Sequence, residues 1–145
     1  MELGTFGAVM AFASQLTTQL AEFCEAASHA ATGTELKTVL QSLSTEAKRD
    51  GAAMEQARRE NVTEMILEPI AGLSQEPYLV APAALTPGAD HEILKMALVF
   101  VDRDQKFFQA AASRLPLPEV ARALRRVAQR REKDLLRLRT LAGSA

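Results

Sequence analysis

The sequence predicts an all-α protein in which four long helices form two hairpins and pack as one bundle. Along four long stretches, apolar residues recur at alternating steps of three and four, the spacing of one face of an α-helix. In each half of the chain, a short run with glycine or proline separates two such stretches. A segment rich in proline and glycine lies between the halves. Helices joined by short connections become antiparallel neighbours, so each half is expected to form a hairpin.

The first helix is expected over about residues 5–31 and the second over about residues 34–60. Gly33 can end the first helix, and Thr32 with Glu35 has the spacing of a capping box for the second. The apolar face of the first helix carries one polar residue, Thr17, whose hydroxyl is expected to bond its own backbone. The inward face of the second helix is expected to carry Leu36, Leu40, Leu43, Ala47, Asp50 and Met54.

The segment over about residues 61–90 is expected to cross the length of the bundle. Its four prolines and two glycines exclude one long helix, and it is too long for a tight turn. A short helix at Thr63–Ile70 is compatible with its sequence. It is more apolar than a linker requires, so it is expected either to fold back on the bundle or to meet a second copy of the chain. The residues concerned are Met65, Ile66, Leu67, Ile70, Leu73, Tyr78, Leu79 and Val80.

The second half begins with Asp90, which is expected to cap a third helix over about residues 91–113. Pro116 and Pro118 then break the chain, and Pro118 suits the first turn of a fourth helix over about residues 118–141. The apolar positions of the fourth helix are Val120, Leu124, Val127, Leu138 and Leu141.

The two halves match each other at one constant offset of 84 positions without a gap. Identical pairs at this offset include Ala13 and Ala97, Phe23 and Phe107, Glu35 and Glu119, Leu40 and Leu124, and Asp50 and Asp134. A single offset that holds across two helices and their connecting loop indicates an internal duplication of a helical hairpin. The long connection then makes the second and third helices parallel.

Composition places the chain among ordinary globular proteins, with 48% hydrophobic residues, 24% charged residues and a net charge of −1. Neither nucleic acid nor a membrane is therefore expected as a partner. The arginine-rich C-terminal third is interpreted as a solvated helix face. No signal peptide or apolar span is recognised, so a cytoplasmic location is expected. The single cysteine, Cys24, excludes an intrachain disulfide and is expected to be a buried thiol.

Four segments resemble rubrerythrin-like proteins, a branch of the ferritin-like superfamily. Residues 21–27 (AEFCEAA) resemble the EFYEEAA stretch of that family's first helix, and residues 106–111 (KFFQAA) resemble its counterpart in the third. Residues 127–135 (VAQRREKDL) resemble the LAEEEKEHL stretch of the fourth, and residues 43–50 resemble the matching stretch of the second. The resemblance implies a ferritin-like four-helix bundle of two helical hairpins joined by a long crossover.

In that family, each hairpin supplies a Glu from its first helix and a Glu-x-x-His from its second, which together hold two iron or manganese ions. Carried over by position, the first-helix and third-helix glutamates fall on Thr17 and Val101. The glutamate of Glu-x-x-His falls on Ala47 in the second helix and on Arg131 in the fourth. Both histidine positions hold aspartate. The two histidines of the chain are placed near helix ends and cannot substitute: His29 and His91.

Physical chemistry suggests what stands at the centre in place of metal. Asp50, Asp134 and Arg131 would be carried inward by their helix faces, and Asp104 lies one turn from Val101. Buried charges must be paired or must reach water, so Arg131 is expected to bridge Asp50, Asp134 or Asp104. Two other interpretations of Asp50 and Asp134 are acids at the boundary of the core and ligands of a remodelled metal site.

Three functions follow from these expectations. The first is a non-catalytic structural or interaction module, without cofactor or catalytic residues, that forms a homo-oligomer, namely a dimer. The second is a metal-binding oxidoreductase or iron-handling protein with iron or manganese on Asp50, Asp104 and Asp134, against which the positive charge of Arg131 argues. The third is a small-ligand pocket in the space that small side chains leave at mid-bundle: Thr17, Ala47 and Val101.

Overall fold

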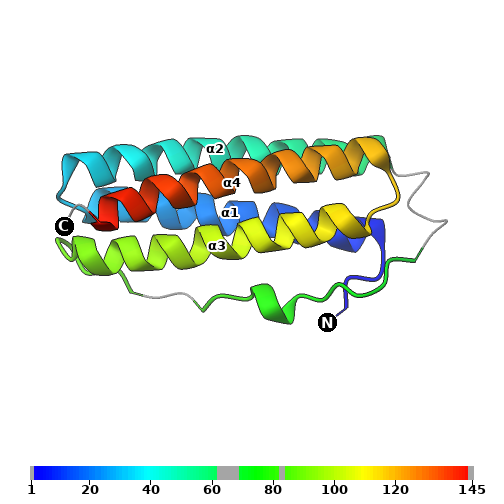
Figure 1. Ribbon diagram of the computed structural model, residues 1–145, viewed down its shortest axis with the longest axis horizontal. Coiled ribbons are helices and arrows are strands. Elements are labelled where there is room, and N and C mark those ends of the chain that lie inside the picture. The colour runs from blue at the N-terminus through cyan, green and yellow to red at the C-terminus, as the bar shows by residue number, and fades with distance from the viewer. Residues whose placement is uncertain (1, 62–68, 82–83, 144–145) are drawn as a thin grey trace.

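The computed structural model describes residues 2–61, 69–81 and 84–143. Four long helices account for most of them: α1 (Phe6–Ala30), α2 (Thr34–Glu60), α3 (Asp90–Arg114) and α4 (Pro118–Gly143). One turn of 3-10 helix, η1 (Glu76–Tyr78), lies between α2 and α3. The expected all-α four-helix fold is therefore confirmed, with every helix beginning and ending close to where periodicity and helix-breaking residues placed it (Figure 1).

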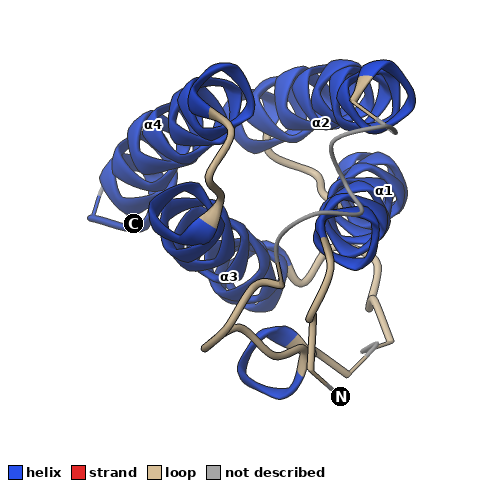
Figure 2. Cartoon of the chain, turned by 90° about the vertical axis from the view of Figure 1, so that its right-hand side faces the viewer, coloured by secondary structure: helices blue, strands red, loops and turns tan. Residues whose placement is uncertain are grey.

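The helices are arranged as two hairpins that pack against each other. Helix α1 pairs with α2, and α3 pairs with α4, while α1 also lies beside α3 and α2 beside α4. Viewed along the bundle, the helices follow one another around its axis in the order α1, α2, α4, α3 (Figure 2). Helices α2 and α3 run in the same direction because the segment between them returns along the length of the bundle (Figure 1). The parallel arrangement expected from the long connection is therefore present.

Two of the expected helix starts are correct in position and wrong in mechanism. Asp90 is the first residue of α3, and the side chain of the residue before it makes no capping bond. Asp90 instead accepts hydrogen bonds from the backbone N–H groups of Thr32 and Gly33, at 2.9 and 2.8 Å. Gly33, not Thr32, flanks α2, so no capping box forms with Glu35. The Asp90 carboxylate from the other hairpin thus accepts the hydrogen bonds of the amides in the loop between α1 and α2, and these amides need no capping side chain from the loop itself.

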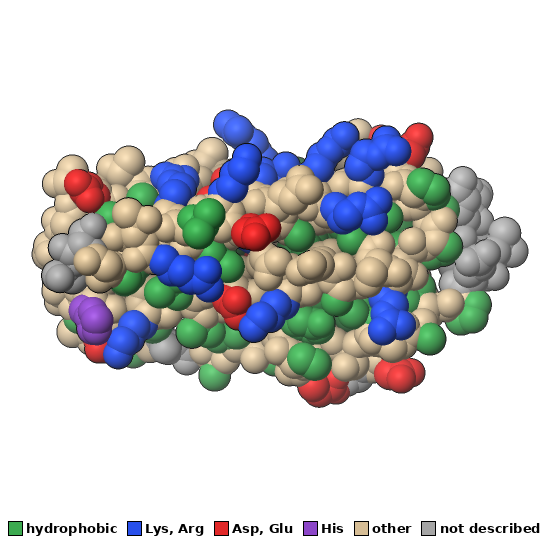
Figure 3. All heavy atoms as spheres, in the orientation of Figure 1, with side chains coloured by type: hydrophobic (Ala, Val, Ile, Leu, Met, Phe, Trp, Pro, Cys, Tyr) green, Lys and Arg blue, Asp and Glu red, His purple; other side chains and the backbone are tan. Residues whose placement is uncertain are grey.

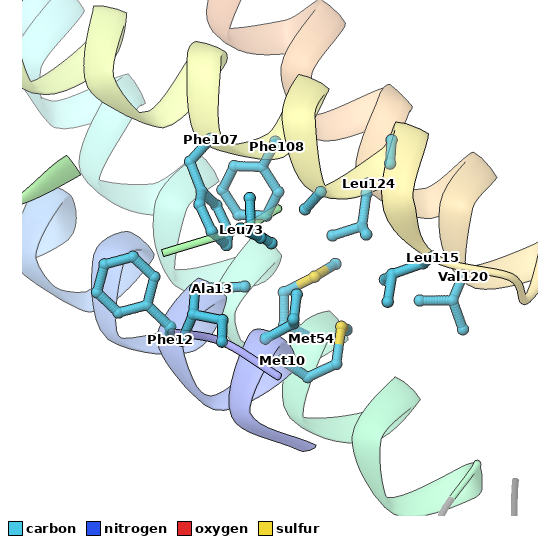
Figure 4. Close-up of a cluster of buried hydrophobic side chains, with 14 of the residues drawn as sticks. Met10, Phe12, Ala13, Met54, Leu73, Phe107, Phe108, Leu115, Val120 and Leu124 are labelled. Atoms are coloured by element: carbon cyan, nitrogen blue, oxygen red, sulfur yellow. The ribbon is translucent and has the colours of Figure 1, made fainter. Parts of the chain in front are cut away.

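The apolar core divides into two clusters along the bundle axis. One cluster gathers the first half of α1 with the second half of α3 and the first half of α4, including Met10, Phe12, Phe107 and Phe108 (Figure 4). Its aromatic rings meet edge to face, with 5.2 Å between the ring centroids of Phe12 and Phe107. The other cluster gathers the opposite halves of these helices with the first half of α2. Polar side chains occupy the level between the two clusters.

The crossover folds back on its own bundle, as one of the two alternatives expected. Backbone hydrogen bonds join it to the N-terminal residues, from Leu3 N to the Leu73 carbonyl at 2.9 Å and from Ile70 N to the Gly4 carbonyl at 3.0 Å. Leu73 and Ile70 are buried in the first cluster, and the Tyr78 ring packs edge to face on the core. Leu79 remains 56% exposed.

Part of the expected crossover structure lies outside the described residues. The short helix proposed at Thr63–Ile70 falls mostly on residues 62–68, which also include Met65, Ile66 and Leu67. Among the residues that are described, no helix combines the length and the apolar character needed to cross a membrane.

Replacing one buried crossover residue tests whether this segment belongs to the core. Leu73 is 4% exposed, so Leu73→Ala removes buried methyl groups and is expected to lower the free energy of unfolding by about 2–4 kcal/mol. Leu79→Ala, six positions away and largely exposed, is the matched control and is expected to change it by less than about 0.5 kcal/mol. Urea denaturation followed by circular dichroism measures both. Equal effects of the two substitutions would show that the crossover does not pack on the bundle.

Candidate functional site

Arg131 of α4 is the largest fully buried side chain among the described residues, and its guanidinium lies at the level between the two apolar clusters. Its Nη1 donates to Glu46 Oε1 of α2 at 2.7 Å, and its Nε donates to Asp104 Oδ2 of α3 at 3.4 Å. Its Nη2 lies 2.9 Å from Asp50 Oδ2, an ion pair without hydrogen-bond alignment. Asp134 Oδ2 is 3.8 Å from Nη1. The structure thus brings together all four residues expected at the centre, with Glu46 added.

A second buried arginine, which the sequence analysis did not single out, completes the α3 side of the network. Arg103 donates from Nε to Asp104 Oδ1 at 3.0 Å, and its Nη2 is 2.9 Å from the same oxygen. The remaining donors of Arg103 reach α1, where they bond the Leu16 carbonyl at 3.2 Å and Gln19 Oε1 at 2.9 Å. The guanidinium also lies 5.1 Å from the centroid of the Phe100 ring. Asp104 is therefore held between two arginines, and the network touches all four helices.

Two half-exposed arginines of α4 extend the network to the surface. Arg130 pairs with Asp50 Oδ1, so both carboxylate oxygens of Asp50 contact an arginine. Arg137 Nη1 lies 3.8 Å from Asp134 Oδ1. Four acidic groups and four guanidinium groups make up the whole network, which we call the Arg131 network: Glu46, Asp50, Asp104, Asp134, Arg103, Arg130, Arg131 and Arg137.

The charge of Arg131 is maintained by the carboxylates around it. Burial opposes the charged form, but the negative charges of Asp104 and Asp50 outweigh burial, and the pKa of Arg131 rises above its ordinary value. Burial also raises the pKa of Asp104, against the opposing effect of Arg103 and Arg131. The Cys24 thiol lies near the same charges, and burial raises its pKa to about 12, so it stays protonated and unreactive.

The pKa of Asp134 is raised far enough for this carboxyl group to hold a proton at neutral pH. Burial is the largest cause, followed by the hydrogen bond and the negative charge of Glu46, and together they raise the pKa of Asp134 to about 8. Arg131 and Arg137 oppose this shift. Two neighbouring carboxyl groups can avoid repulsion by sharing one proton. With that proton bound, the deeply buried charges balance, because Arg103 and Arg131 face Asp50 and Asp104.

The six positions onto which the sequence resemblance carries metal ligands all lie in the interior: Thr17, Ala47, Asp50, Val101, Arg131 and Asp134 are each at most 3% exposed. The hydroxyl of Thr17 donates to the Ser14 carbonyl at 2.8 Å, the backbone bond expected for it. Helices α1 and α2 are in close contact here, since a Cβ at Gly51 would lie 2.9 Å from Thr17 Oγ1. Thr17, Ala47 and Val101 belong to the packing of the bundle and make no hydrogen bond or ion pair to the Arg131 network.

The acidic residues surround the guanidinium of Arg131 and are not grouped around a common point of their own. Within residues 2–61, 69–81 and 84–143, no three His, Cys, Asp or Glu side chains are arranged so that they could hold a metal ion. His29 lies in the last turn of α1 and His91 in the first turn of α3, far from the middle of the bundle.

Four members of the Arg131 network are not predicted from the sequence: Glu46, Arg103, Arg130 and Arg137. The offset of 84 carries a signal that points to the first three. It pairs Gln19 with Arg103, which hydrogen-bond to each other, and Glu46 with Arg130, which both contact the network. Equivalent positions near the axis between two hairpins lie close together, so complementary polar residues there point to contact.

No protein-family model, curated protein or solved structure matches this chain.

Removing the central guanidinium should leave several buried carboxylates without a counter-charge. Arg131→Met keeps much of the side-chain volume and is expected to lower the free energy of unfolding by about 3–5 kcal/mol. Arg126→Met, at an exposed position of the same helix, is the control and is expected to change it by less than about 0.5 kcal/mol. Chemical denaturation at pH 7 measures both. A loss for Arg131→Met no larger than that of the control would contradict the central role of this ion pair.

The shared proton predicts a specific dependence of stability on pH. The folded protein holds a proton on Asp134 up to about pH 8, whereas the unfolded chain releases it near the ordinary value of 3.8. The free energy of unfolding therefore falls as pH rises between these values. Asp134→Asn should flatten that decline, while the exposed Glu132→Gln should leave it unchanged. Urea denaturation at a series of pH values measures the slopes, and an unaltered slope in Asp134→Asn would exclude the shared proton.

Proposed function

We propose that this protein is a ferritin-like, rubrerythrin-like bundle that has lost its di-metal site and acts as a non-catalytic structural or interaction module. One observation carries the proposal: the guanidinium of Arg131 is buried and surrounded by four carboxyl groups. The sequence resemblance assigns a metal-binding glutamate to this position. A fixed positive charge takes the place of the charge that metal ions would supply.

The electrostatics of the Arg131 network support loss of metal binding. A divalent ion at the centre would be repelled by Arg131 and Arg103 and would have to displace the ion pairs of Asp50 and Asp104. The pKa of Asp134, raised to about 8, keeps a proton on that carboxyl group at neutral pH, which weakens it as a ligand for hard cations, and Glu46 is paired with Arg131. Each carboxyl group of the centre thus already has a partner that competes with metal.

A structural role follows from how the Arg131 network joins the helices. It ties α1 through Gln19, α2 through Glu46 and Asp50, α3 through Asp104, and α4 through Arg131. Buried polar networks with directional partners favour one arrangement of helices over others, because a shifted helix would leave charges unpaired. The network therefore fixes the register of the two hairpins and serves the scaffold, with no reacting group required.

The homodimer expected from the sequence remains a prediction. Most described apolar residues of the crossover pack on their own bundle, which reduces the surface that this segment could offer to a second copy. The large apolar side chains that stay exposed among the described residues are Leu79, Val99 and Leu136.

Metal analysis of the native protein tests the proposal directly. Protein purified without chelator and then incubated with Fe²⁺ or Mn²⁺ is expected to retain far less than one ion per chain after desalting, because the carboxyl groups are engaged by arginines. Inductively coupled plasma mass spectrometry measures the ratio. Near-stoichiometric iron, manganese or zinc would overturn the proposal in favour of a metal-binding oxidoreductase or iron-handling protein that uses Asp50, Asp104 and Asp134.

A variant that carries the family's metal ligands at the six assigned positions tests whether the ferritin-like assignment is correct, independently of whether the native protein binds metal. It combines six substitutions: Thr17→Glu, Ala47→Glu, Val101→Glu, Arg131→Glu, Asp50→His and Asp134→His. If the resemblance places these positions correctly, this variant should bind about two Mn²⁺ ions per chain. The matched control keeps Arg131 and carries the other five substitutions, and it should bind less. A six-fold variant that is helical by circular dichroism and binds no ion would contradict the ferritin-like assignment.

A further inference from the structure

A groove of about 590 Å³ runs between α2 and α4 at the level of the Arg131 network. Its walls are formed by polar and charged side chains: Ser42, Thr45, Glu46, Arg49, Asp50 and Arg130. Ser42, Thr45 and Arg49 are spaced three and four residues apart, so they lie along one face of α2. The volume lies in the range of small-molecule sites. The proposed structural role of the Arg131 network does not account for this groove.

The charged residues that line the groove are not all paired. Its two acids, Glu46 and Asp50, both contact the buried Arg131 behind them, and Asp50 also contacts Arg130. Arg49 has no ion pair or hydrogen bond with any described residue. Arg49 and the four arginines of the Arg131 network thus stand against the four acidic groups of that network, which leaves a positive charge in excess, carried on the rim by Arg49.

Several hydrogen-bond donors on the rim of the groove also have no partner among the described residues. The Ser42 hydroxyl has no hydrogen-bond partner in the described part of the chain, whereas Thr45 donates to the Gln41 carbonyl. Arg130 uses one Nη2 contact to Asp50, and its other N–H groups make no bond to described residues. A guanidinium presents parallel donors that match the two oxygens of a carboxylate or phosphate. Excess positive charge and free donors therefore meet at one place.

The surroundings of the groove strengthen its positive potential. Lys and Arg side chains gather over α4 and the adjoining edge of α2 (Figure 3). Exposed α4 cations without an ion pair to described residues include Arg122, Arg125, Arg126, Lys133 and Arg139. Like charges on neighbouring turns slightly destabilise a helix, so this density does not serve folding. It attracts anions toward the groove.

We propose that the groove between α2 and α4 binds a small organic anion through a carboxylate or phosphate group held by Arg49, Arg130 and the Ser42 hydroxyl. The unpaired positive charge of Arg49 favours an anionic group, and the hydroxyl groups of Ser42 and Thr45 suit further polar atoms of the ligand. Because the groove is open to solvent, the dissociation constant is expected on the order of 1 mM and to rise with ionic strength.

Titrations followed by amide NMR of the full chain test this site. The probes are succinate, inorganic phosphate and glycerol 3-phosphate, with chloride keeping the ionic strength constant. Saturable shifts are expected at the amides of Ser42, Thr45 and Arg49. The tighter of succinate and the phosphates identifies the group that the site prefers. Absence of a saturable shift with every probe, at up to roughly ten times the expected dissociation constant, would overturn the proposal.

Two exposed arginines provide a matched pair of variants. Arg49→Gln should raise the dissociation constant about fivefold or more. Arg122→Gln removes the same charge from an unpaired exposed position outside the groove lining and should change it less than about twofold. Ser42→Ala should weaken binding about twofold. Equal weakening by Arg49→Gln and Arg122→Gln would show that the anion senses only the general potential, and the assigned site would be wrong.

A titration with a polyanion tests the alternative that this face binds nucleic acid and not a small anion. A short DNA duplex that binds more tightly than the small probes, with shifts spread along α4, would make this face a surface for phosphate backbones and would overturn the small-ligand site. None of these results depends on whether the protein retains metal, so failure of the anion site leaves the proposed structural role untouched.

Discussion

The cost of burying the guanidinium of Arg131 is the constraint on which the rest of the bundle depends. A charge removed from water destabilises the fold unless partners surround it, and here the partners come from three other points of the chain. Those partners bring charges of their own, which in turn need Arg103, Arg130 and a proton on the Glu46–Asp134 pair. The polar residues between the two apolar clusters thus form one network in which each buried charge requires a partner of opposite charge or a proton.

The helices themselves could be predicted because their signals are local. Apolar spacing, Gly33 and Pro118 set where the helices begin and end, and none of these signals requires knowledge of the partner helix. The constant offset of 84 extended this to the arrangement of the hairpins. The cap at Asp90 was assigned wrongly because its carboxylate bonds amides 57 and 58 residues away. A hydrogen bond between residues so far apart in the sequence competes with local capping, and the residues next to Asp90 give no signal that predicts it.

The centre could be predicted only in part, for a related reason. Helix faces carry Asp50, Asp104, Arg131 and Asp134 inward, so periodicity finds them. Glu46 stands one position from the inward Ala47 and reaches the centre through its long side chain. Arg103 does the same from beside Asp104. Long polar side chains can turn inward from the edge of a helix face, and only the geometry of the partners decides whether they do.

The two hairpins contribute different charges to the centre and are not interchangeable. To the Arg131 network, the first hairpin contributes the acids Glu46 and Asp50 and no cation, while the second contributes four arginines and two aspartates. Two copies of the first hairpin would bring acids together without a counter-charge, and two copies of the second would bring an excess of guanidinium groups. Each hairpin is thus the electrostatic complement of the other, and only the two different hairpins together complete the bundle with its central charges paired.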